Sequence, residues 1–155
     1  MRIGKALHEL HRSESALAVE FSRVAERYPR EREVRHVAGD LAVWSRDHVR
    51  EIVATAPRYR VDLSGPEYPV PFEEETRELP DEDSDPELAL LADLRRLYRM
   101  SGGVALDWDL LGQGAQAVAD ADLLAVADRC GPRSARQMRW ARGMLKILSP
   151  QILAT

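Results

Sequence analysis

Apolar residues recur at alternating steps of four and three along residues 2–28, which are the a and d positions of a heptad. The stripe consists of Ile3, Leu7, Leu10, Glu14, Leu17, Phe21, Val24 and Tyr28. This spacing predicts a long amphipathic helix, and Pro29 is expected to end it. One position breaks the stripe, because Glu14 is a carboxylate where the pattern expects an apolar side chain.

A second helix is predicted from about residue 31 to Thr55, where Pro57 closes it. Its stripe consists of Val34, Val37, Leu41, Trp44, His48, Glu51 and Thr55. The connection between the first two helices is very short. They are therefore expected to form an antiparallel hairpin.

Residues 57–86 break the helical pattern with six prolines, and their second half is acidic. Such a stretch can be a flexible linker. It can also be a strap that runs the length of a helical bundle, because an extended chain covers about 3.3 Å per residue. We expect a crossover strap here.

Two further helices follow the strap. The third is predicted to begin at Asp85-Pro86, a capping carboxylate followed by a proline in the first turn. Its apolar stripe stays in register through Ser101-Gly102-Gly103, which favours one continuous helix. The fourth is predicted from about Asp120 to Pro150, with a kink at Gly131-Pro132.

These elements predict an all-α fold, in which residues 1–155 form a single four-helix bundle. A short loop joins the first two helices and another joins the last two, while residues 57–86 make one long crossover between helices two and three. The third helix is then parallel to the second, and neighbouring helices are antiparallel.

The charge distribution modifies this prediction only slightly. The chain carries a net charge of −4, but residues 67–87 hold ten acidic residues and one basic residue, so the remainder of the chain is net positive. A basic body with an acidic strap favours neutralisation within the chain over binding to nucleic acid.

Cysteine content and hydropathy bear on location. Cys130 is the only cysteine, so the fold does not depend on an intrachain disulfide. No stretch approaches the length of an apolar membrane span, and the first residues lack the apolar core of a signal peptide. We therefore expect a cytoplasmic protein that is not inserted in a membrane.

A polar layer is predicted across the bundle. In a hairpin that turns near residue 30, Glu14 lies close to the level of His48, and His11 lies between His48 and Glu51. The parallel third helix brings Ser101 to a similar level, and the fourth helix adds Gln137. A buried carboxylate such as Glu14 needs a partner, and His48 is the nearest candidate.

Two interpretations of this layer stay open. In the first, its side chains form hydrogen bonds that fix the register of the helices. In the second, His11-x-x-Glu14 and His48-x-x-Glu51 supply imidazole and carboxylate ligands to Fe, Mn or Zn, because residues three apart share a helix face. We favour the structural interpretation, since buried polar pairs outnumber metal sites.

The order of two long helices, a crossover and two more helices resembles the ferritin-like superfamily. This resemblance covers nearly the whole chain and implies a di-iron site with a Glu on the first helix and Glu-x-x-His on the second. Glu14 and His48 match that pattern, and Gln137 is a candidate match on the fourth helix. Ser45 and Ser101 stand where the pattern has carboxylates. The resemblance therefore implies a degenerate site without catalytic residues.

Two hypotheses about function follow. One is metal binding at His11, Glu14, His48 and Glu51. The other is a non-catalytic interaction or scaffold protein whose polar core layer is structural. A homo-oligomer, with a homodimer as the simplest form, or binding to a protein partner, is expected for either hypothesis.

Overall fold

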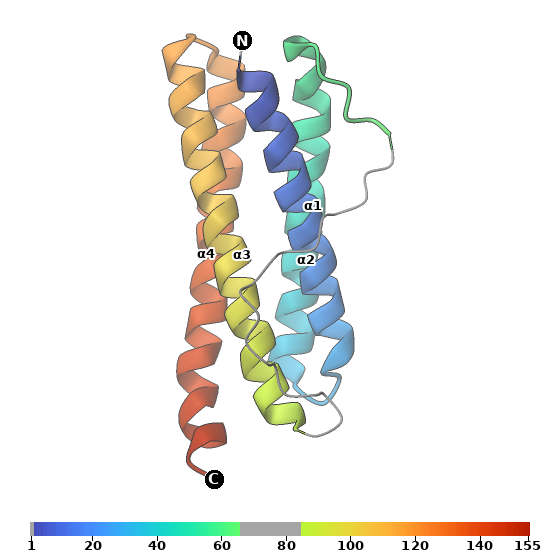
Figure 1. The fold of residues 1–155 in the computed structure, drawn as a ribbon, viewed down its shortest axis with the longest axis vertical. Helices are drawn as coiled ribbons and strands as arrows, with labels where there is room; N and C mark the ends of the chain where they lie inside the picture. Colours follow the sequence, from blue (N-terminus) through green and yellow to red (C-terminus); the bar gives the residue numbers. More distant parts are fainter. Residues whose placement is uncertain (1, 66–84) are drawn as a thin grey trace.

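The computed structural model describes residues 2–65 and 85–155. It contains the helices α1 (Ile3–Arg27), α2 (Arg32–Thr55), α3 (Pro86–Ala117) and α4 (Ala121–Leu153), with a short 3₁₀ helix η1 (Ala56–Tyr59) after α2. These described residues contain no strand, so the predicted all-α class and its four helices are confirmed (Figure 1).

The helices form two antiparallel hairpins that lie against each other. The first hairpin pairs α1 with α2 and the second pairs α3 with α4, while α1 also packs against α3 (Figure 1). The end of α2 and the start of α3 lie at opposite ends of the bundle, so these two helices are parallel as predicted. Of the neighbouring pairs, α2 and α4 approach each other least closely.

Local sequence sets the starts of α3 and α4. The Asp85 carboxylate accepts a hydrogen bond from the Leu88 N–H at 3.1 Å, and the Asp120 carboxylate accepts one from the Leu123 N–H at 3.0 Å. Each side chain satisfies a backbone donor that has no partner within the first turn of its helix. Both predicted helix starts are confirmed.

Proline ends helices less strictly than the sequence analysis expected. The helix α4 is continuous through Gly131 and Pro132, and it extends beyond Pro150 to Leu153. The predicted end at Pro150 is wrong, because this proline lies in the last turn and its carbonyl still accepts a hydrogen bond from the Ala154 N–H. A proline there removes only one backbone donor, which the helix tolerates near its end.

Glycines let α3 and α4 approach each other closely. The helix α3 is continuous through Gly102 and Gly103, as predicted. A Cβ at Gly102 would lie 3.4 Å from the Met138 sulfur, and a Cβ at Gly131 would lie 3.4 Å from the Trp108 Cβ. A Cβ at either position would be in close van der Waals contact with the facing helix, so these glycines leave little free space between α3 and α4.

The core is built largely from predicted stripe positions, although Val37, Trp44 and Glu51 of α2 are only partly buried. Leu10, Leu17 and Phe21 of α1 are almost completely buried, as are Leu94 and Leu97 of α3. Burying each such side chain stabilises the fold by about 1.5–3 kcal/mol. The stripe positions of Glu14, His48, Ser101 and Gln137 are buried as well.

Most of the predicted crossover strap lies outside the described residues. The part that is described, residues 57–65, begins in η1 and packs Leu63 against the bundle. A Cβ at Gly4 would lie 2.9 Å from a methyl carbon of Val61 and 3.3 Å from the Tyr59 carbonyl oxygen. Gly4 therefore makes room for this segment beside the first turn of α1. Within residues 2–65 and 85–155, no helix has the length and apolar character needed to span a membrane.

Candidate functional site

The carboxylate of Glu14 lies at the centre of the bundle, and its side chain is completely buried. Its Oε2 atom is 2.6 Å from the His48 Nδ1 of α2 and accepts a hydrogen bond from the Trp108 Nε1–H of α3 at 2.9 Å. The rings of His48 and Trp108 meet edge to face, with centroids 6.0 Å apart. One carboxylate oxygen thus joins three helices.

The predicted pair of Glu14 and His48 is therefore present, and Trp108 is an additional partner that the sequence analysis did not assign. A carboxylate oxygen can only accept here, so we assign the shared hydrogen to His48 Nδ1. The other polar atoms of the pair, Glu14 Oε1 and His48 Nε2, have no hydrogen-bond partner among the described residues.

A second part of the polar layer joins α4 to α2. The side-chain amide of Gln137 donates from Nε2 to the Leu41 carbonyl and to the Ser45 hydroxyl, both at 2.9 Å. The hydroxyls of Ser101 and Ser134 are buried without a hydrogen-bond partner among the described residues. Ser45, at the position where the ferritin-like pattern has a glutamate, thus contacts another helix through a neutral hydrogen bond.

His11 lies on α1 one turn before Glu14 and is also buried. Burial lowers the pKa of its imidazole, and the nearby His8 lowers it further. His11 is therefore held in its neutral form at neutral pH, because the charged form would lose hydration.

Glu51 lies one turn after His48 on α2, but its carboxylate is bound to α4. Oε1 accepts a hydrogen bond from the Arg129 guanidinium at 2.8 Å, and Oε2 accepts one from the Cys130 thiol at 3.0 Å. Burial acts to raise the pKa of the Glu51 carboxyl, but these two hydrogen bonds outweigh it and leave the pKa below its usual value. Burial and the neighbouring Glu51 raise the pKa of the Cys130 thiol, so it stays protonated.

The four predicted metal ligands do not converge on one point. Among residues 2–65 and 85–155, no three His, Cys, Asp or Glu side chains form a group that could hold a metal ion. Glu14 and His48 bond directly to each other, while Glu51 is held by Arg129 and Cys130. The described residues therefore do not fit the ligand set of a ferritin-like di-iron site.

A small cavity opens between α2 and α4, the neighbouring helices that contact each other least. Its volume is about 340 Å³. It is lined by Asp47, His48 and Glu51 of α2 and by Arg129, Cys130 and Arg133 of α4. The cavity thus reaches from the exposed arginines to the buried imidazole of His48.

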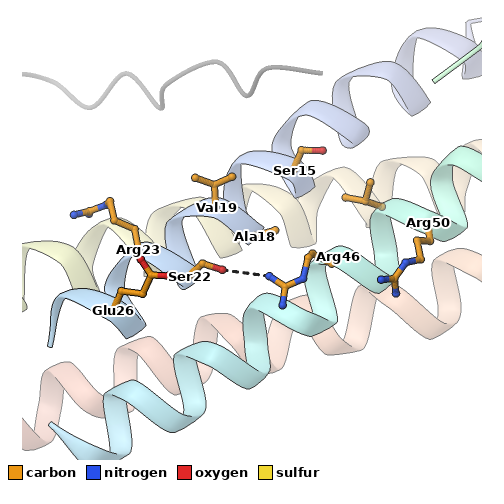
Figure 2. A pocket seen from close by; sticks show the side chains of 9 residues that line it. Ser15, Ala18, Val19, Ser22, Arg23, Glu26, Arg46 and Arg50 are labelled. Atoms are coloured by element: carbon orange, nitrogen blue, oxygen red, sulfur yellow. Dashed lines mark hydrogen bonds between the residues drawn. The ribbon is translucent and has the colours of Figure 1, made fainter. Parts of the chain in front are cut away.

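A larger and shallower groove, with a volume of about 640 Å³, lies between α1 and α2 on the outside of the bundle (Figure 2). It is lined by Ser15, Ala18, Val19, Ser22, Arg23, Glu26, Arg46, Val49 and Arg50. Arg46 reaches across it to donate a hydrogen bond to the Ser22 hydroxyl at 3.2 Å. The sequence contains one signal for this groove, because Val19 is apolar but lies off the stripe of α1.

Comparison with known proteins gives no relative from which a function could be transferred: no family model, curated protein or solved structure matches this chain.

Proposed function

We propose that this chain is a non-catalytic interaction protein with ferritin-like architecture that self-associates through the groove between α1 and α2. The groove itself is the observation that supports this proposal. Val19 is 55% exposed, and the buried Ala18 and the half-buried Val49 line the same groove. An exposed apolar side chain in a groove between two outer helices is a candidate contact for another protein.

We take a second copy of the chain as the partner, because one pair of opposite charges can form between two copies. Arg50 lies at one end of the groove, Arg23 and Glu26 lie at the other, and Val19 lies between them (Figure 2). Within its own chain Arg23 pairs with Glu20 and Asp93, and Arg50 pairs with Asp47. In a twofold dimer each surface meets itself in the reverse direction. Two antiparallel grooves would then bring Arg50 of each copy to Glu26 of the other, with the Val19 side chains in contact at the centre.

The polar layer supports a structural role for the core. Its two hydrogen-bonded groups, around Glu14 and around Gln137, join helices to each other through their own side chains. Metal binding at His11, Glu14, His48 and Glu51 stays a prediction, which the metal content of the purified protein tests. The cytoplasmic location also stays a prediction.

The proposal is tested by measuring the molar mass of the purified protein by light scattering across a range of concentrations. The wild-type chain is expected to form a dimer, and Val19→Asp is expected to shift it to the monomer because it places a charge at the centre of the interface. Leu106→Asp is the matched control. Leu106 is 63% exposed on α3 and does not line the groove, so this variant should remain dimeric.

A charge exchange tests the orientation of the two copies. Glu26→Arg or Arg50→Glu alone should weaken the dimer, since each places like charges together across the twofold axis. The double variant should restore it. A wild-type chain that stays monomeric at all concentrations, or a dimer unaffected by Val19→Asp, would contradict the proposal.

A further inference from the structure

The cavity between α2 and α4 contains two carboxylates that already have cationic partners. Asp47 accepts a hydrogen bond from Arg50 at 2.5 Å, and Glu51 accepts hydrogen bonds from Arg129 and the Cys130 thiol. These carboxylates are thus neutralised by neighbouring side chains. The other polar groups that line the cavity include the imidazole of His48 and the guanidinium of Arg133.

His48 provides a buried polar atom without a partner. The residue is only 1% exposed, yet it lines the cavity. Its Nδ1–H is used by Glu14, and its Nε2 has no hydrogen-bond partner among the described residues. In a ring whose Nδ1 carries the hydrogen, Nε2 is an acceptor, and leaving such an atom buried and unpaired is costly. The atom is therefore suited to a ligand that brings a hydrogen-bond donor.

Arg133 provides the positive charge. It lies one turn after Arg129 on the same face of α4, and its guanidinium lies over the Trp44 ring at 5.7 Å from the ring centroid. Stacking on an aromatic face orients the guanidinium and leaves its N–H groups available at the edge. No carboxylate of the described residues forms an ion pair with Arg133.

We propose that this cavity binds a small oxyanion that carries a hydroxyl group, of which hydrogen phosphate is the simplest. The charged oxygens accept hydrogen bonds from Arg133, and the hydroxyl donates to Nε2 of His48. A volume of about 340 Å³ accommodates such an ion with several waters, since one water occupies about 30 Å³ of liquid. Glu14 acts as a positioning residue, because its bond to Nδ1 presents Nε2 as the acceptor.

Isothermal titration calorimetry with inorganic phosphate tests the proposal on the full chain. The wild-type protein is expected to show saturable binding. Arg133→Gln should weaken it at least about tenfold, because a charge-assisted hydrogen bond to phosphate is lost. Arg133→Lys should retain intermediate affinity, since it keeps the charge but loses the planar fork.

Arg136→Gln is the matched control, because Arg136 is exposed on the same helix and does not line the cavity. It should bind phosphate as the wild type does, which separates the site from a general effect of positive charge. Circular dichroism of each variant checks that the bundle is intact.

Sulfate tests the requirement for a hydroxyl, because it carries the same kind of charged oxygens but has no hydrogen to donate at neutral pH. It should bind more weakly than phosphate. The proposal is overturned if the wild type does not bind phosphate, if Arg133→Gln and Arg136→Gln bind it equally, or if sulfate binds as tightly as phosphate. None of these outcomes depends on the oligomeric state measured for the groove.

Discussion

At the scale of single residues, Glu14 occupies an apolar stripe position because its carboxylate accepts hydrogen bonds from two buried donors. A leucine at this position would leave both donors unpaired. Its Oε2 accepts from His48 and Trp108 in a fully buried environment. The three side chains form one unit, in which each polar group depends on the others. The free energy of the unit is therefore not a property of Glu14 alone.

Replacing Glu14 should reveal this dependence in the free energy of unfolding. Glu14→Leu should destabilise the fold by about 3–5 kcal/mol, because it leaves the buried His48 and Trp108 donors without an acceptor. Glu14→Gln keeps an acceptor oxygen and should cost less, about 1–3 kcal/mol.

The double variant Glu14→Leu/His48→Leu should be more stable than Glu14→Leu, since it also removes one unpaired donor. Urea unfolding followed by circular dichroism measures all three variants. A double variant that is no more stable than Glu14→Leu would show that Glu14 and His48 do not act as a unit. Mass spectrometry of the same preparations reports bound Fe, Mn or Zn, and metal that is present in the wild type and lost in Glu14→Gln would support the metal hypothesis.

At the scale of the helices, Asp120 connects the start of α4 to η1. It caps α4 and also accepts hydrogen bonds from the Tyr59 hydroxyl and from Arg58, whose guanidinium lies 2.9 Å from both carboxylate oxygens. The hydrogen bond from the Tyr59 hydroxyl lowers the pKa of Asp120 most, and those from the Leu123 N–H and from Arg58 lower it further. Together they bring this pKa to about 2.

A lowered pKa means that the folded state favours the charged carboxylate. The stabilisation is complete above the unfolded pKa near 3.8, and it is lost as the pH falls from there toward about 2. Asp120→Ala should therefore lower stability at pH 7 by about 1 kcal/mol or more through loss of the cap.

The loss caused by Asp120→Ala should become smaller as the pH falls below 4, and thermal unfolding at several pH values measures it. Asp128→Asn is the control, because Asp128 is exposed on the same helix, away from this cluster. A constant difference between Asp120→Ala and the wild type across this pH range would refute the assignment.

The helices themselves could largely be predicted from the sequence, because their stripes and caps depend on local spacing. Asp85 and Asp120 are examples, since a capping side chain acts on a backbone group three residues away. Pro150 shows the limit of this reasoning. Whether a proline ends a helix depends on the packing around the following turn, which local sequence does not specify.

At the scale of the whole molecule, polar contacts hold the two hairpins together at several levels. One lies near the start of α3, where the buried Asp93 accepts hydrogen bonds from Arg23 at 2.8 Å, from Arg27 at 3.1 Å and from the Tyr28 hydroxyl at 2.6 Å. Arg23 and Arg27 lie near the end of α1, and Tyr28 is its C-cap residue. Asp93 lies on α3, which belongs to the second hairpin.

Asp93→Ala should reduce the free energy of unfolding by about 3 kcal/mol, because it removes the buried carboxylate that these three donors share. Asp109→Ala, at an exposed position of the same helix, should have almost no effect. Chemical unfolding curves of the two variants provide the comparison, and equal stabilities would contradict the role assigned to Asp93.

The hydrogen-bonded pair of the candidate site could be predicted where one hairpin contains both partners, while Gln137 could be placed in the polar layer but not assigned its partners. Glu14 and His48 share the first hairpin, so counting from its turn placed them at similar levels. The contact of Glu14 with Trp108, and those of Glu51 with Arg129 and Cys130, could not be predicted in this way. These contacts cross from one hairpin to the other, and their geometry depends on how the hairpins rotate and slide against each other.

The position of Trp108 has a consequence for the order of events in folding. Each hairpin consists of helices that are close in sequence, and such local contacts form early and fast. Glu14 can meet His48 as soon as the first hairpin closes, but the indole N–H of Trp108 reaches that carboxylate only after the second hairpin has docked. The burial of the Trp108 indole therefore reports the step in which the two hairpins dock against each other.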